Sequence, residues 1–98
     1  MHARMGRVSF SADSADAMVG HVRDTIVPRY EGTDGFKGFT LLLDRSGGEG
    51  IGISFWESED AMHASDQVGD QARSGAAEAG GGSDQGRAFY EVAIDTMA

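Results

Sequence analysis

Three side chains of this chain are candidates for acid–base or anion-binding chemistry. His21 is a candidate general base, because an imidazole in a pocket can accept a proton near neutral pH. Arg7 can bind a carboxylate or an enolate oxygen, and Tyr90 can donate a hydrogen bond to a ligand. Each also has a structural interpretation. His21 fits a half-solvated helix position, Arg7 a partner of Glu91, Asp95 or a second subunit, and Tyr90 an anchor of a dimer seam. The catalytic residues therefore stay open.

A tryptophan at the end of an expected strand indicates a wall for a flat ligand. Trp56 offers a large aromatic face and one indole N–H donor. The alternative is a large side chain that packs at the rim of the fold. With its polar and aromatic neighbours on the same predicted sheet face, it is expected to bound a ligand-binding cavity lined by Arg7, Ser9, Thr40, Ser54, Trp56 and Tyr90.

Other chemistries are disfavoured by residue type and spacing. The chain has no Cys, which excludes disulfides, thiolate catalysis and thiolate metal sites. Its three His are far apart in the expected fold, so we predict no metal site and no cofactor. The glycine-rich run at 47–52 precedes a strand and lacks the Lys-Ser/Thr pair of a phosphate-binding loop.

Length and charge limit the classes of partner. The 98 residues suffice for a single domain, 1–98, and the net charge is −8 with a pI of about 4.6. That sign argues against nucleic acid and against an anionic membrane surface. The first seven residues lack the apolar core of a signal peptide, and no apolar run has the length of a membrane span. A cytoplasmic location is expected.

The alternation and helical periodicity of the chain predict a β-α-β-β-α-β order. Pro28 is expected to end or kink the first helix, and Ser58 to cap the second. The helices and the glycine linker at 80–84 would connect four strands. The expected strands cover 4–11, 36–44, 50–56 and 87–95, and the expected helices cover 14–27 and 58–79. Right-handed crossovers then give an α+β, ferredoxin-like fold, a four-stranded antiparallel sheet with both helices on one face.

The hairpin register decides which side chains lie under the helices. If Asp44 pairs with Gly50, the face under the helices is wholly apolar: Phe39, Leu41, Leu43, Ile51, Ile53 and Phe55. Trp56 and Ser54 then lie on the open face with Thr40. An uncovered, partly apolar sheet face needs a partner, and a second copy of the chain is the simplest one.

Four segments carry a resemblance to a known family. They are Gly-Phe-x-Gly-Phe at 35–39, Leu-Leu-Leu-Asp-Arg at 41–45, Phe-Trp-Glu-Ser-Glu-Asp-Ala-Met at 55–62 and Tyr-Glu-Val-Ala at 90–93. The chain resembles the dimeric α+β barrel superfamily, and within it the antibiotic-biosynthesis-monooxygenase-like domains. The resemblance implies a homodimer whose two sheets face each other as a barrel, with a ligand cavity on the open face of each.

The same resemblance separates the activities of the superfamily. Its haem-degrading members use Asn, Trp and His, whereas this chain has no Asn and places Ser65 and Gly75 near the Trp and His positions. Haem degradation is therefore disfavoured. Its polyketide oxygenases use Asn, Trp, Arg and Tyr, of which Asn is missing here.

Three functions remain at this stage. The first is binding of a small apolar or aromatic molecule, with the activity unassigned. The second is a cofactor-independent monooxygenase of an aromatic polyketide- or quinol-like substrate, in which Arg7 or Tyr90 steadies an oxyanion and His21 takes the proton. The third is a non-enzymatic structural or interaction module whose interior is closed by Leu42, Met5 and Trp56.

Overall fold

Strands and helical segments alternate along the chain in the predicted β-α-β-β-α-β order. The computed structural model describes residues 1–97. Its elements are β1 (His2–Ser9), η1 (Ala12–Ser14), α1 (Ala15–His21), η2 (Val22–Ile26), α2 (Val27–Glu31), β2 (Phe36–Asp44), β3 (Glu49–Trp56), α3 (Glu59–Ala64), α4 (Asp66–Ala79) and β4 (Asp84–Glu91).

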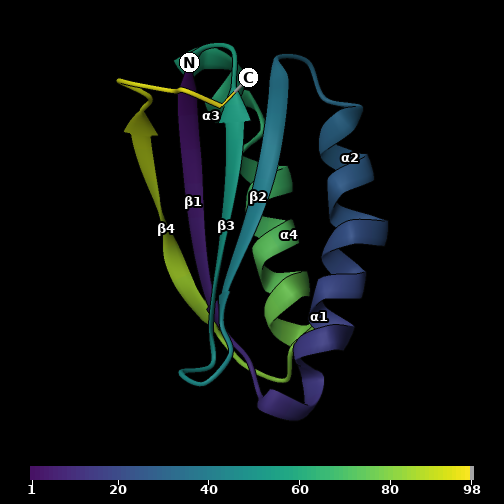
Figure 1. Cartoon of the computed structure of the whole chain (residues 1–98). Helices are drawn as coiled ribbons and strands as arrows, with labels where there is room; N and C mark the ends of the chain where they lie inside the picture. The colour runs from purple at the N-terminus through teal and green to yellow at the C-terminus, as the bar shows by residue number, and fades with distance from the viewer. Residues whose placement is uncertain (98) are drawn as a thin grey trace.

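The four strands form one antiparallel sheet in the order β2-β3-β1-β4. Figure 1 shows the α1–α2 helix and α4 side by side on the same face of this sheet, with the opposite face bare. This arrangement confirms the predicted α+β, ferredoxin-like class. β2 has the predicted bounds, whereas β1 and β4 begin two or three residues earlier than expected.

The first helix continues past the predicted end. Pro28 lies in the first turn of α2, directly after the helical residues of η2, so the helix passes through a residue that has no N–H to donate. The five residues before α2 form η2, a π-helical segment whose wider turn separates α1 from α2. The helix therefore extends to Glu31 instead of ending near Val27.

The second helical region begins as predicted and then divides. The Ser58 hydroxyl accepts a hydrogen bond from the Ala61 N–H at 3.1 Å, which caps α3. The helix breaks at Ser65, and α4 continues from Asp66. The predicted stripe of small residues is buried at Gly69, Ala72 and Ala76.

The predicted hairpin register is wrong by one residue. Asp44 pairs with Glu49, not with Gly50, across a turn in which Gly48 has a φ of 68°. Phe39, Leu41 and Leu43 lie under the helices as expected, but they share that face with Ser54, Gly52 and Gly50. The apolar residues Ile51, Ile53 and Phe55 therefore lie on the open face. The prediction failed because it placed the more apolar face of β3 under the helices, whereas the structure turns that face outward. Alternation shows that a strand has two faces but not which of them the helices cover.

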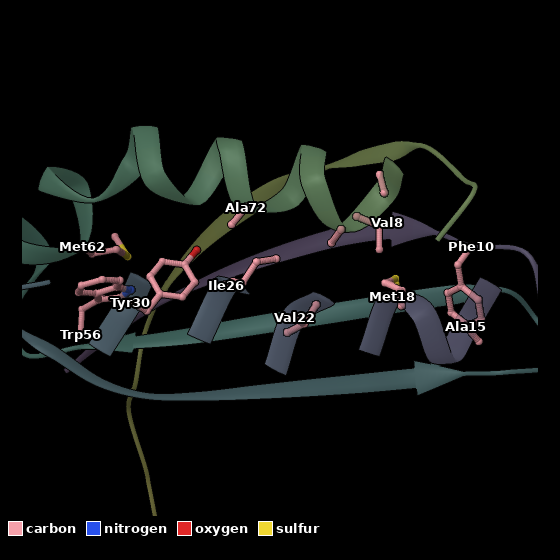
Figure 2. Packing of buried hydrophobic residues seen from close by; sticks show 12 residues of the cluster. Val8, Phe10, Ala15, Met18, Val22, Ile26, Tyr30, Trp56, Met62 and Ala72 are labelled. Atoms are coloured by element: carbon pink, nitrogen blue, oxygen red, sulfur yellow. The ribbon is translucent and has the colours of Figure 1, made fainter. Parts of the chain in front are cut away.

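The core lies between the helices and the sheet. Trp56 is fully buried at one end of it, where its ring meets the rings of Tyr30 and Phe36 edge-on at 5.7 and 5.5 Å. Figure 2 shows Trp56, Tyr30 and Met62 together at this end, with Met18 and Phe10 at the other. Between these ends the core narrows to small side chains, and this is where the cavity lies.

Candidate ligand-binding cavity

A cavity of about 50 Å³ lies between the helical layer and the inner face of the sheet. Every layer of the fold contributes to its wall: β1, β2, β3, the α1–η2–α2 helix and α4. Most of the wall is apolar, with Val8, Met18, Val22, Ile26, Phe39, Leu41, Ala72 and Ala76. The volume holds a few water molecules and is far below the ~300–1,000 Å³ typical of pockets for drug-sized ligands.

The cavity exists because small residues meet across the layers. Gly6 and Gly52 supply no side chain from the sheet, and Gly69, Ala72 and Ala76 supply almost none from α4. A Cβ at Gly52 would already lie 3.1 Å from the Phe39 ring, and one at Gly6 would lie 3.3 Å from Arg73 Cδ. Because Gly52 and Gly6 have no side chain, the Phe39 ring and the Arg73 side chain can lie across the inner face of the sheet.

Arg4 is the charged residue most deeply placed in this wall. Its side chain is 3% exposed, and its Nη2 donates hydrogen bonds to the Met62 carbonyl at 2.6 Å, to Ser65 Oγ at 2.9 Å and to Asp66 Oδ1 at 2.6 Å. Its Nε and Nη1 are buried without a hydrogen-bond partner. One nitrogen thus anchors the guanidinium, and the other two, which lie close to Gly69 of α4, are unsatisfied donors.

Gly69 makes room for this guanidinium. A Cβ at position 69 would lie 2.5 Å from Arg4 Nη1 and 2.8 Å from Cζ. α4 can therefore pass directly over the planar group only because residue 69 has no side chain. Arg4 Cζ also lies 5.8 Å from the centre of the Trp56 ring, within cation–π range.

Asp66 supplies the negative charge that pairs with Arg4. Partial burial acts to raise the pKa of this carboxyl, but hydrogen bonds from Arg4 and His63 outweigh it and hold the pKa below its usual value. His63 Nδ1 lies 3.0 Å from Asp66 Oδ2, on the solvent side of the pair. Asp66 is therefore ionised at neutral pH and faces water more than it faces the cavity.

A second polar group lies at the aromatic end of the cavity. The Trp56 Nε1 donates a hydrogen bond to Ser54 Oγ at 2.9 Å. Burial raises the pKa of the Tyr30 hydroxyl above its usual value, and the nearby Arg4 and Ser54 oppose this shift only in part. Tyr30 is therefore a neutral phenol at physiological pH, able to donate or accept a hydrogen bond.

The structure does not bring the predicted cavity residues together. The placement of Trp56 and Ser54 on the open face is wrong, because the register shift turns both side chains under the helices. Arg7, Thr40 and Tyr90 do lie on the open face as expected. Of the six predicted lining residues, the cavity wall includes Ser54 alone.

The remaining predicted site residues lie apart from one another. Arg7 is half exposed, 3.8 Å from Glu49, and Ser9 hydrogen-bonds with Ser83 at 3.1 Å. His21 ends α1, with its ring close to Gly75 of α4. Since none of these side chains lines the cavity, the structure does not assemble the predicted acid–base set. Within residues 1–97, no three His, Asp or Glu side chains gather so as to hold a metal ion.

Sequence reasoning missed Arg4, and it assigned Tyr30 to the solvated loop after the first helix, whereas Tyr30 is buried. Arg4 is in β1, two residues from Gly6 on the same face, and Tyr30 follows Ile26 by one helical turn. One signal was present in the sequence. Arg4 alternates with Gly6 and Val8, so it lies on the strand face that is otherwise suited to burial. A buried arginine needs a charged or hydrogen-bonding partner, which marks the position as unusual.

Comparison with curated proteins identifies mycobacterial relatives. The uncharacterized protein Rv2557 of Mycobacterium tuberculosis (strain ATCC 25618 / H37Rv) is 38% identical over 82 residues, which is 84% of this chain and 37% of the relative. The uncharacterized protein Rv2558 of the same strain is 38% identical over 65 residues, 66% of this chain and 28% of the relative. The chain thus spans roughly a third of the length of the relatives it matches. No family model matches the chain.

Solved structures of similar shape come from one fold group. The ActVA-Orf6 monooxygenase of Streptomyces coelicolor, in complex with Nanaomycin D, has a TM-score of 0.73 at 14% identity over 99% of this chain and 91% of that one. The haem-degrader MhuD of M. tuberculosis, with two haems bound, has a TM-score of 0.69 at 21% identity over 99% and 100%. The chain therefore has the fold of these proteins, which is the fold that the resemblance implied.

Proposed function

We propose that this protein binds a small molecule in the cavity between its helices and its sheet. The observation that carries the proposal is the buried Arg4, held by one nitrogen and left with two unpaired donors beside an apolar hollow. Buried donors without partners are costly, and a ligand acceptor that reaches them removes that cost.

The π-helical segment supports the same location. Val22 and Ile26 both belong to η2 and both line the cavity. π-helical turns occur often at functional sites, because they displace a few side chains without ending a helix. Fold neighbours add an analogy, since ActVA-Orf6 binds Nanaomycin D and MhuD binds two haems in the solved structures.

Xenon uptake tests whether the cavity takes up a molecule at all. We expect saturable shifts in the amide NMR signals of Val22, Ile26 and Ala72 under xenon pressure, since small apolar cavities admit this probe. Ala72→Leu fills the space and should abolish the shifts, whereas the control Ala17→Leu on the exposed face of α1 should not. Unchanged cavity signals in the parent protein, or equal uptake by Ala72→Leu, would contradict the proposal.

We also propose that the open sheet face pairs with the same face of a second copy. Leu42 and Tyr90 there are 49% and 53% exposed, beside the half-buried Ile51, Ile53 and Phe55. Such a patch on a small domain favours association. Light scattering should give a mass about twice the 10.3 kDa of one chain. Ile53→Asp should give a monomer, and Thr25→Asp on the exposed part of η2 should not. A monomeric parent at high micromolar concentration would contradict the dimer.

Monooxygenation of an electron-rich ring remains a second candidate. Arg4 and the neutral Tyr30 could steady an oxyanion in an enclosed, apolar site. Oxygen consumption with a quinol is the test, and we expect Tyr30→Phe to lose it. Equal turnover by this variant would remove Tyr30 from the reaction.

No helix among the described residues is long and apolar enough to span a bilayer. The cytoplasmic location stays a prediction.

A further inference from the structure

The six residues that follow β4 extend beyond the sheet with few contacts to hold them. We call these residues, 92–97, the arm. The Val92 N–H donates a hydrogen bond to the Met1 carbonyl at 2.9 Å, and the Met97 N–H donates one within the arm to Asp95 Oδ1 at 3.0 Å. In the part of the chain that the structure describes, the rest of the arm makes no hydrogen bond to another element. Figure 1 shows the arm in yellow, turning away from the end of β4 near the N-terminus.

The arm carries two large apolar side chains that lie almost completely in water. Ile94 is 85% exposed and Met97 is 81% exposed, whereas the other exposed large apolar side chains of the described residues range from 37% to 53%. Moving such side chains out of water is favourable. The helices and the sheet of the same chain do not provide that burial.

The sequence of the arm continues the strand pattern of β4. Every second residue is apolar: Tyr90, Val92 and Ile94. This alternation predicts a strand over 87–95, yet β4 ends at Glu91. A strand needs a neighbour for its N–H and C=O groups, and beyond Val92 the described residues provide none. The missing neighbour explains the early end of β4 and indicates that the arm pairs with another chain.

The arm begins at the open face of the sheet. Tyr90 lies on that face, and Val92 and Ile94 follow it at the two-residue spacing of a strand. Two copies that pair through their open faces therefore bring the arm of each copy beside the sheet of the other. Six extended residues span about 20 Å. A sheet of four strands spaced about 4.8 Å apart is about 14 Å wide, so the arm is long enough to cross it.

We propose that the arm docks on a second copy of the chain and buries Ile94 and Met97 against the apolar side chains of its open face. The inference rests on the proposed dimer and names the segment that each copy contributes to the other. The receiving side chains are only partly buried in a single chain: Leu42, Ile51, Ile53 and Phe55. The arm and the open face thus each supply the apolar contact that the other lacks.

Contacts between labelled and unlabelled chains test the docking directly. Chains with ¹³C-labelled methyl groups are mixed with unlabelled chains, and isotope-filtered NMR then detects only contacts between two copies. We expect such contacts from the methyl groups of Ile94 or Met97 to Leu42, Ile51, Ile53 or Phe55 of the second copy. Contacts of the two arm residues with their own chain alone, in a sample where other open-face residues give contacts between copies, would overturn the proposal.

A charge placed on the arm tests its contribution to assembly. Ile94→Asp should raise the Kd of the dimer at least tenfold in analytical ultracentrifugation. The circular dichroism spectrum should not change, because this side chain is 85% exposed and packs on little of its own chain. The control Thr25→Asp adds the same charge on the exposed part of η2 and should keep the Kd of the parent protein. Equal Kd values for Ile94→Asp and the parent protein would overturn the proposal.

The outcomes separate the arm from the dimer on which it rests. If the parent protein is a dimer that Ile53→Asp dissociates but Ile94→Asp does not weaken, the open faces pair and the docking of the arm is wrong. If the parent protein is a monomer at high micromolar concentration, the proposed dimer is itself wrong, and the arm then has no second copy to dock on.

Discussion

The two faces of β3 differ in the size of their side chains. The inner face of β3 carries Gly50, Gly52 and Ser54 before Trp56, whereas its open face carries Ile51, Ile53 and Phe55. The usual two-layer arrangement would place the bulk under the helices. Here the bulk faces outward, and the inner face is kept thin where α4 and the Phe39 ring approach it.

This inversion assigns different roles to the faces. A thin inner face leaves space for Arg4, Tyr30 and a cavity, so chemistry is expected between the layers. The outer face provides apolar area, and its polar side chains Arg7, Thr40 and Tyr90 line no part of the cavity, so assembly is expected there. Paired substitutions, one on each face, test whether the two faces have these different roles.

Removing Trp56 should produce the largest effect. Trp56 is fully buried and packs on Tyr30 and Phe36, so Trp56→Ala should lower the free energy of unfolding by about 3–5 kcal/mol. Leu42→Ala, on the half-exposed outer face, should lose about 1 kcal/mol in the same assay at low micromolar protein. Guanidinium unfolding measures both, and similar losses would show that the two faces are equally packed.

Loss of the Asp66 charge should produce the next largest effect. Asp66→Asn leaves the buried Arg4 without its counterion, and about 2 kcal/mol of stability should be lost at pH 7. The pKa of Asp66 is lower in the folded than in the unfolded protein. Its contribution is therefore fully present above about pH 4, the unfolded value, and falls away as the pH drops through the folded value.

Unfolding midpoints measured from pH 7 down to pH 2 check this dependence. The difference between the parent protein and Asp66→Asn should shrink below about pH 4. The control Asp16→Asn removes an almost fully exposed partner of Arg45 and should change little at any pH. A constant difference across the range would show that Asp66 does not act through its charge.

Gly69→Ala should reverse the usual effect of alanine in a helix. Alanine normally stabilises a helix by up to ~1 kcal/mol relative to glycine, and Gly20→Ala in α1, where the new Cβ has ordinary contacts, should show this gain. At Gly69 the Cβ would overlap the Arg4 guanidinium, and the overpacking should outweigh the gain and leave a net loss of about 1 kcal/mol. Thermal melts of the two variants should therefore shift in opposite directions, and a shift in the same direction would mean that Arg4 moves aside freely.

The sequence contained enough information for the architecture because each element had its own signal. The Ser58 cap, the strand at 36–44 and the small-residue stripe of α4 all appear where local patterns place them. These signals depend on neighbours along the chain, and so they survive without knowledge of the tertiary contacts.

The site could not be predicted in the same way, because it depends on one long-range choice. Pairing Asp44 with Glu49 instead of Gly50 moves Trp56 and Ser54 from the open face to the core. Both registers place Phe39, Leu41 and Leu43 of β2 under the helices, so the pattern of β2 does not choose between them. The actual register provides the space that Phe39 needs above Gly52, beside the space that Arg4 needs at Gly69. This need for space depends on how β1 and α4 pack against the hairpin, so it cannot be predicted from the local sequence.

Arg7→Ala should have the smallest effect on stability and the clearest meaning for the ligand site. Arg7 and Glu49 lie 3.8 Å apart, each 46% exposed, so the loss should be under ~1 kcal/mol. Arg7 and Arg4 belong to the same strand but to opposite faces. Xenon titrations of Arg7→Ala should shift the amide signals of Val22 and Ile26 as in the parent protein if the ligand enters the inner cavity. Loss of these shifts in Arg7→Ala would instead tie binding to the open face, and that face would then have to combine assembly with binding.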